Sequence, residues 1–210
     1  MVEVVFPLPM FPLQSVLFPG IVLPLHVFEP RYQQLVKDLS SGPSNFGVVL
    51  IARGSEVGGG DQRCEVGTIA RLAERITLDD GTSVILAVGV SRIRVRNWLP
   101  DDPYPLALVE DLLDPVPQGD EFPELVADLE KRLRYLLLLK DEIAMSSEIP
   151  VQVALSSDRI EALWQMCAVA PIPVLDQQNL LCQDEPVRRA EMLGGLIDDA
   201  ISLYEGQLRD

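Results

Sequence analysis

The stretch "SVLFPGIVLPLHVFEPRY", from Ser15 to Tyr32, decides the fold of this chain. It is apolar, it is interrupted by prolines, and it holds the single histidine, His26. A signal peptide does not fit, because no Lys or Arg precedes Arg31. A membrane-spanning helix does not fit either, because the repeated prolines up to Pro24 would break it. We therefore expect short extended pieces joined by turns and buried in a soluble protein.

The end of this stretch predicts a short helix. Pro30 suits the first position of a helix, where its missing N–H would have no partner in any case. The apolar residues that follow are spaced at i, i+3, i+4 and i+7 and so share one helical face: Tyr32, Leu35, Val36 and Leu39. We expect a strand that delivers the chain into a helix covering an open end of a sheet.

The hydrophobic period then divides the chain. From Val4 to about Asp111 the pattern is strand-like, with β-rich runs such as "FGVVLIA" (Phe46 to Ala52). Two such runs flank Asp79 to Thr82, where an Asp-Gly pair is a strong signal for a hairpin. After Pro117 the pattern is helical.

Four helices are expected in the second half, beginning near Pro123, Asp158, Asp176 and Pro186. A β-rich half followed by a helical half predicts the α+β class. We expect the chain to divide into a β-rich subdomain, residues 1–115, and a helical subdomain, residues 116–210.

Charge and cysteine content exclude several classes of protein. The 210 residues carry 17 basic and 32 acidic side chains, for a formal charge of -15. This balance argues against general binding of nucleic acid or anionic membranes. Three cysteines without a CxxC pair, and one histidine, make a structural zinc site or a disulfide framework improbable. Without a visible targeting signal, the expected location is the cytoplasm.

Catalytic signatures are absent from the sequence. It has no phosphate-binding loop, no GxGxxG, no HExxH and no GxSxG. We interpret His26 as a structural residue at a strand end, hydrogen-bonded to backbone, and Cys167 as a small core residue on an apolar helix stripe. No catalytic, cofactor-binding or metal-binding residue is therefore expected.

One basic pattern remains, in "SRIRVRNW". Arg92, Arg94 and Arg96 share one face of a strand, and Ile93 and Val95 share the other. The arginines form either a solvated face that pairs with the acidic surplus or a surface where an acidic or extended peptide docks.

Trp98 follows these arginines in "RNWLPDDPYP" (Arg96 to Pro105), where prolines and paired aspartates predict a surface loop. It is either a partly exposed anchor for a partner or a cap folded back on the β-rich core. Trp98, Arg92, Arg94 and Arg96 are the candidate peptide-binding residues.

"FPLPMFPLQSVLFPGIVLPLHVFEPRYQQLV" (Phe6 to Val36) resembles the start of the N-terminal, substrate-binding domain of Lon proteases. It carries the FPL, LFPG, LPL and FEPRY elements of that family in order. The resemblance continues through "VGTIARL", "DDGTSVILAVGVSRIRV" and "PLALVEDLLD", and into the helical half as "PIPVLDQQNLLCQDEPVRRAEML". It implies a PUA-like β-barrel with one short helix, followed by a helical subdomain.

The resemblance implies a non-catalytic module that binds exposed or unfolded protein segments in connection with proteolysis. The expected partners are unfolded or partly folded client proteins, together with a protease. We expect neither the ATPase nor the Ser-Lys protease of full-length Lon. A PUA-like module that binds a small molecule or RNA is the alternative, and an enzyme is a third. The client and the oligomeric state stay open.

Overall fold

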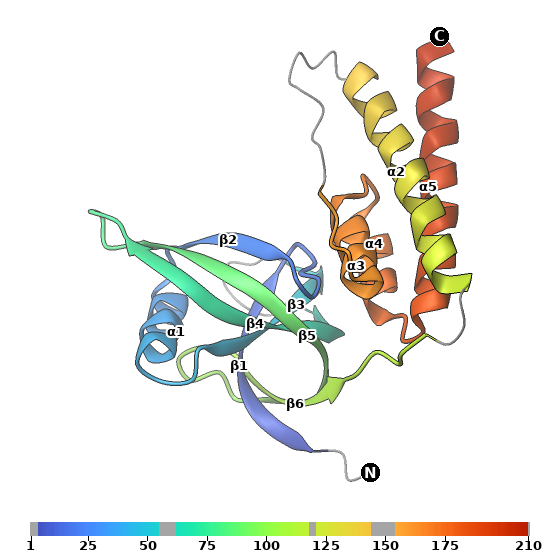
Figure 1. The fold of residues 1–210 in the computed structure, drawn as a ribbon. Helices are drawn as coiled ribbons and strands as arrows, with labels where there is room; N and C mark the ends of the chain where they lie inside the picture. The colour runs from blue at the N-terminus through green and yellow to red at the C-terminus, as the bar shows by residue number, and fades with distance from the viewer. Residues whose placement is uncertain (1–3, 55–61, 118–120, 144–153, 210) are drawn as a thin grey trace. The chain divides into compact units, whose positions relative to one another are not determined.

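The structure, a computed structural model, describes residues 4–54, 62–117, 121–143 and 154–209. Six strands precede four of the five helices, which confirms the α+β class (Figure 1). The elements in chain order are β1 (Val5–Leu13), β2 (Val22–Val27), α1 (Pro30–Ser41), β3 (Asn45–Arg53), β4 (Gln62–Thr77), β5 (Ser83–Leu99), β6 (Leu106–Leu112), α2 (Glu121–Ile143), α3 (Arg159–Val169), α4 (Val174–Cys182) and α5 (Pro186–Arg209). Two compact units, Met1–Leu113 and Asp114–Asp210, divide close to the boundary that the sequence predicts after residue 115.

The strands of the first unit close on themselves. Their order in the sheet is β2-β5-β4-β3-β1-β6, and β5 also pairs with β6. This additional pairing joins β5, β4, β3, β1 and β6 into a ring, which is the topology of a barrel. The remaining strand, β2, is attached to β5 alone among the described strands. Figure 1 shows β2 at the margin of this unit.

Prolines occupy strand positions where a missing N–H is tolerated. In an antiparallel pair, every second residue directs its backbone groups at the partner. The N–H of Gly89 donates to the carbonyl of Ile21 at 2.9 Å, one residue before β2 begins. Ile21, Leu23 and Leu25 therefore direct their backbone groups at β5, and Pro24 directs its own away from β5. A proline at that position removes no hydrogen bond between the two strands. The sequence pattern thus suits a strand at an open edge.

The first core cluster lies under α1. Glu29 occupies the N-cap position and Pro30 begins the helix, as the sequence predicts. All four residues of the expected apolar face are buried: Tyr32, Leu35, Val36 and Leu39. They pack with buried residues of the strands, among them Phe11, Phe46 and Ala87. Leu23 and Leu25 of β2 are partly buried and pack against the same cluster.

A second core cluster involves the other part of β5. Ile93 and Val95 are buried there with residues of four neighbouring strands, among them Met10 and Val109. The expected hairpin is also confirmed, because β4 and β5 meet at a turn in which Gly81 has a φ of 82°. Such a positive φ favours glycine.

A strap, residues 14–21, crosses the outside of β4 and β5. The hydroxyl of Thr68 donates to the carbonyl of Leu17 at 2.6 Å, and the N–H of Gly20 donates to the carbonyl of Gly89 at 2.9 Å. A Cβ at Gly89 would collide with the backbone carbonyl of Phe18. The LFPG element of the sequence therefore forms a turn held tightly against the sheet.

The second unit consists of helices. The two long ones, α2 and α5, run parallel and side by side (Figure 1). Gly194 of α5 packs against α2, where a Cβ would lie 3.1 Å from a guanidinium nitrogen of Arg132 and 3.3 Å from Leu129. The Arg132 side chain also donates to the Gly194 carbonyl at 2.6 Å. This close approach explains a glycine that would otherwise only weaken the helix.

The helix α3 begins where the sequence predicts. The carboxylate of Asp158 accepts hydrogen bonds from the N–H groups of Ile160 and Glu161 at the start of α3. The helix ends at Val169, two residues before Pro171. Among the described residues, no helix combines the length and apolar composition of a membrane span.

Candidate functional site

Three separate elements of the Lon-like sequence pattern meet at one hollow, the β1–β2 pocket, which has a volume of about 250 Å³. The second FPL element contributes from β1, LPL from β2, and FEPRY from the segment that enters α1. The residues lining the pocket are Phe11, Leu13, Ser15, Leu23, Pro24, Leu25, His26, Val27, Phe28, Glu29 and Tyr32. Segments of the pattern that are apart in the sequence therefore line one pocket in the fold.

Aromatic rings and an ion pair hold one wall of the β1–β2 pocket. The rings of Phe11 and Tyr32 stack with centroids 4.0 Å apart and planes 9° apart. Arg31 lies over the Tyr32 ring at 4.6 Å, and its Nε donates to Glu29 at 3.1 Å. Phe28, by contrast, is 52% exposed and offers apolar surface at the rim.

His26 connects the rim to the β4–β5 hairpin. Its Nε2 lies 3.0 Å from Oγ1 of Thr82, and this hydroxyl donates to the carboxylate of Asp80 at 2.7 Å. The Thr82 hydrogen bond is the main cause that lowers the pKa of Asp80 below its usual range. The backbone partner expected for this histidine is wrong, because its ring pairs with a hydroxyl.

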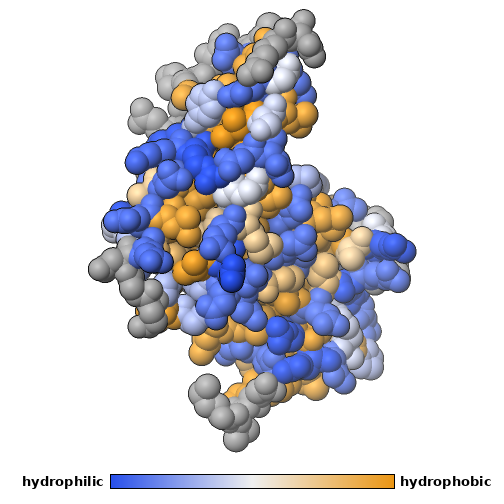
Figure 2. All heavy atoms as spheres, turned by 90° about the vertical axis from the view of Figure 1, so that its right-hand side faces the viewer, coloured by the Kyte–Doolittle hydropathy of each residue, from blue (hydrophilic) through white to orange (hydrophobic). Residues whose placement is uncertain are grey.

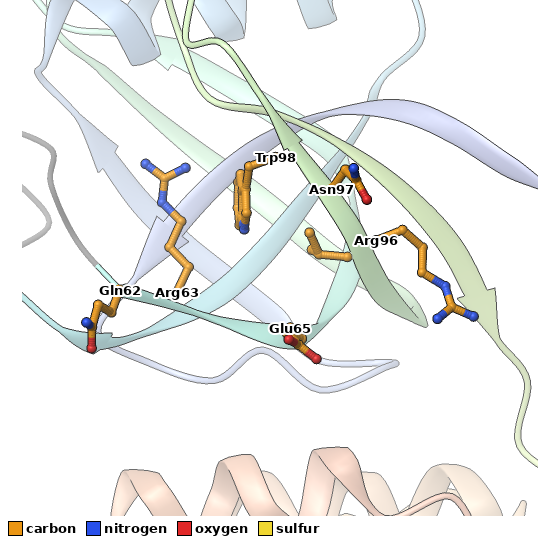
Figure 3. A pocket seen from close by; sticks show the side chains of 7 residues that line it. Gln62, Arg63, Glu65, Arg96, Asn97 and Trp98 are labelled. Carbon is orange, nitrogen blue, oxygen red and sulfur yellow. The ribbon is translucent and has the colours of Figure 1, made fainter.

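Trp98 lies in a second, shallow hollow of about 430 Å³ (Figure 3). The structure places it in β5, opposite Ala107 of β6, so the predicted loop from Arg96 to Pro105 is wrong over its first four residues. One side of Trp98 packs against the second core cluster. The guanidinium of Arg63 covers the ring at 4.3 Å, as Figure 3 shows.

The three arginines of the predicted strand face have different environments. Arg94 and Arg96 both pair with the buried carboxylate of Glu110 on β6, at 3.8 Å and 2.6 Å. Figure 3 shows Arg96 pointing away from Trp98. Arg92 is only 1% exposed, so the prediction of a solvated face is wrong at this position. Its neighbour across the ladder is Thr68, which the strap covers.

The thiols also differ in their environments. Cys167 is fully buried, as predicted, and burial raises its pKa to about 12. Cys182 is exposed and Cys64 is half-buried. Within the described ranges, no group of three or more His, Cys, Asp or Glu side chains is arranged to hold a metal ion.

The sequence points to Trp98, but it does not reveal two other sets of residues around these hollows. Arg63 was missed because it lies far from Trp98 in the sequence and follows no motif. Phe11 and Phe28 were missed as lining residues although they belong to the FPL and FEPRY elements. The signal was present in the family pattern, but only the fold brings its elements together.

Comparison with solved structures agrees with this architecture. The Lon N-terminal domain protein from Xanthomonas campestris is 30% identical, with a TM-score of 0.66 over 90% of this chain and 98% of that chain. The N-terminal domain of the Mycobacterium avium complex Lon protease is 16% identical, with a TM-score of 0.64 over 92% of this chain and 99% of that chain. The second likeness concerns the fold alone.

Sequence comparison identifies longer relatives. The Lon protease of Cytophaga hutchinsonii is 29% identical over 94% of this chain and 25% of its own length. Lon protease 1 of Myxococcus xanthus is 26% identical over 94% of this chain and 25% of its own length. The chain thus spans about a quarter of these curated relatives. The model of the ATP-dependent protease La (LON) substrate-binding domain matches residues 7–199, and the chain belongs to this family.

Proposed function

We propose that this protein is a non-catalytic cytoplasmic module that binds exposed or unfolded segments of other proteins in connection with proteolysis. The observation that carries the proposal is the family match, which extends over residues 7–199 and concerns a substrate-binding domain. The Lon relatives suggest that a protease is a further partner. Units 1–113 and 114–210 act as the two parts of one such domain.

The surface offers contacts of the size that a short segment needs. On the face that Figure 2 shows, hydrophobic residues lie in several patches separated by hydrophilic ones. The exposed large apolar residues include Phe28 and Val22 at β2 and Leu138 and Leu203 on the long helices. Small separate patches suit extended segments, because a folded partner usually needs one larger continuous surface.

Trp98 is a second candidate contact in this proposal. Its ring is packed on one side and covered by Arg63 on the other, so a partner would bind at the ring edge and the guanidinium. Arg96 lines the hollow, and it shares the carboxylate of Glu110 with Arg94. Arg92 is too deeply buried to contact a partner.

The test measures binding to a model protein that is kept unfolded by reduction and alkylation. Fluorescence anisotropy of the labelled unfolded protein reports the binding. We expect saturable binding without ATP and no cleavage of the bound protein. Trp98→Ala should weaken binding severalfold if the ring is a contact, and Trp98→Phe should restore part of it. Absence of binding to the unfolded protein by the wild-type chain would contradict the proposed function.

A further inference from the structure

Two open strand edges border the β1–β2 pocket. On β2, the backbone groups of Val22, Pro24 and His26 face away from β5, and no other described strand pairs with them. On β1, the pairing with β6 ends at Pro9, and the N–H of Met10 still bonds to the carbonyl of Pro105. Beyond that point, β3 is the one described strand that pairs with β1. Residues from both strands line the same pocket.

We propose that an extended apolar segment of another protein, carrying Lys or Arg beside its apolar residues, binds in the β1–β2 pocket by adding a strand to the open edge of β2. This inference rests on the proposed function and assigns it a site and a kind of segment. It differs from the predicted contact at Trp98, which lies in the other hollow.

The backbone of β2 supplies the first argument. Val22 and His26 each present an N–H and a carbonyl at the open edge, whereas Pro24 presents a carbonyl alone. An added antiparallel strand would form two backbone hydrogen bonds with Val22, two with His26 and one with the carbonyl of Pro24. Main-chain bonds of this kind do not depend on the sequence of the segment. They therefore suit a module that meets many unfolded proteins.

The side chains of the β1–β2 pocket supply the second argument. Phe11, Leu13 and Tyr32 form an apolar wall, and Phe28 at the rim is 52% exposed. A volume of about 250 Å³ lies below the range of pockets for drug-sized ligands and suits only a few side chains. Because alternate residues of a strand point the same way, every second residue of the segment would be apolar.

Charge supplies the third argument. The carboxylate of Asp80 lies at the His26 end of β2, joined to that histidine through the hydroxyl of Thr82. The neighbouring Asp79 is also exposed, and the whole chain has a formal charge of -15. A basic residue next to the apolar run of the segment is therefore attracted, and an acidic one is repelled.

The experiment uses the full chain and a fluorescein-labelled peptide of alternating valine and threonine with lysine at each end. Anisotropy measures its dissociation constant, and a second peptide with glutamate at each end tests the charge requirement. We expect the lysine peptide to bind several times more tightly, with a difference that shrinks at high salt. A photoreactive version should crosslink to Leu13–Ser15 or to His26–Phe28.

Two variants probe the backbone and the pocket separately. Val22→Pro removes a donor from the open edge, and Val22→Thr is its control because it keeps the N–H and the shape. Ser15→Trp fills the exposed mouth of the β1–β2 pocket, and Ser15→Ala is its control. We expect Val22→Pro and Ser15→Trp each to weaken peptide binding about tenfold, the size of one or two lost hydrogen bonds or contacts. Circular dichroism checks that each variant is folded.

The outcomes separate the site from the function. If the wild type binds peptide or unfolded protein but both variants bind equally well, or crosslinks fall only near Trp98, the proposed site is wrong and the proposed function stands. If the wild type binds neither ligand, both fail. A dimer that forms without peptide and is lost in Val22→Pro would assign the edge to a second copy and overturn the inference.

Discussion

At the scale of single residues, Arg189 connects three helices of the second unit. It is fully buried, its guanidinium lies 3.6 Å from the Trp164 ring, and its Nε donates to the carbonyl of Leu180 at 3.2 Å. Its Nη2 donates to the carbonyl of Gln183 at 2.5 Å and to the carboxylate of Asp114 at 2.8 Å. One side chain thus joins α3, the end of α4 and α5 to the first residue of this unit.

Arg189→Met should lower the free energy of unfolding by about 3–5 kcal/mol, because it removes the buried donor of the hydrogen bonds to a carboxylate and two carbonyls. Urea denaturation followed by circular dichroism measures the loss. Arg188→Met is the matched control. Its side chain is 72% exposed and pairs only with Glu191, so the change should stay within about 0.5 kcal/mol. Equal effects of the two substitutions would contradict the proposed role of Arg189.

The burial of Cys167 makes stability depend on alkaline pH. Burial raises the pKa of its thiol from an ordinary 9.0 to about 12 in the folded chain. Above pH 9 the unfolded chain loses this proton while the folded chain keeps it, so ionisation favours unfolding as the pH rises. The free energy of unfolding should therefore fall by about 1 kcal/mol between pH 8 and pH 10 on account of this thiol.

Denaturation at several pH values measures this loss, and two cysteine variants identify its origin. Cys167→Ala should remove about 1 kcal/mol of the alkaline loss, although the cavity makes the variant less stable at neutral pH. Cys182→Ala should retain the full loss, because that residue is exposed. An unchanged slope in Cys167→Ala would show that other groups cause the alkaline loss.

At the scale of secondary-structure elements, α5 contains two adjacent glycines in different surroundings. A Cβ at Gly194 would press on Arg132 and Leu129 of α2, whereas a Cβ at Gly195 would meet no atom within 4 Å. Gly195→Ala should stabilise the protein by up to about 1 kcal/mol, because alanine costs less backbone entropy in a helix. Gly194→Ala should gain less or destabilise. Thermal unfolding of both variants compares them, and equal stabilisation would argue against close packing of α2 and α5.

A helix, turn or cap could be predicted where residues close together in the sequence determine it. The face of α1, the turn at Gly81 and the cap at Asp158 follow from neighbouring residues, and all three were predicted. The burial of Arg92 was not, because it depends on the strap that crosses β4 and β5. Alternation along a strand separates its two faces, but it does not say which other segment covers each face.

The candidate sites were harder to predict for the same reason. Trp98 is a candidate contact residue from the sequence, but its partner Arg63 comes from a different strand. His26 pairs with Thr82, 56 residues away, so no local pattern could name that partner. Contacts between strands depend on the register of the closed sheet, which alternation along a single strand does not determine.

At the scale of the whole molecule, charge discriminates between the proposed function and the RNA-binding alternative. The formal charge is -15, and Arg94 and Arg96 of β5 both pair with the carboxylate of Glu110. We expect no shift of a single-stranded RNA in a native gel at physiological salt, because few cations are available to neutralise phosphates. A shift that is lost when Arg94 and Arg96 are changed to Glu would favour RNA binding instead.

The prolines of the open edges have a consequence for self-assembly. Exposed strand edges are the usual starting points of aggregation, since one chain can extend the sheet of the next without limit. Pro24 on β2 lacks the donor that a continuous ladder between identical copies requires, and Pro12 on β1 shares the outward-facing side of Met10. The two prolines thereby protect the molecule against aggregation through its own strand edges.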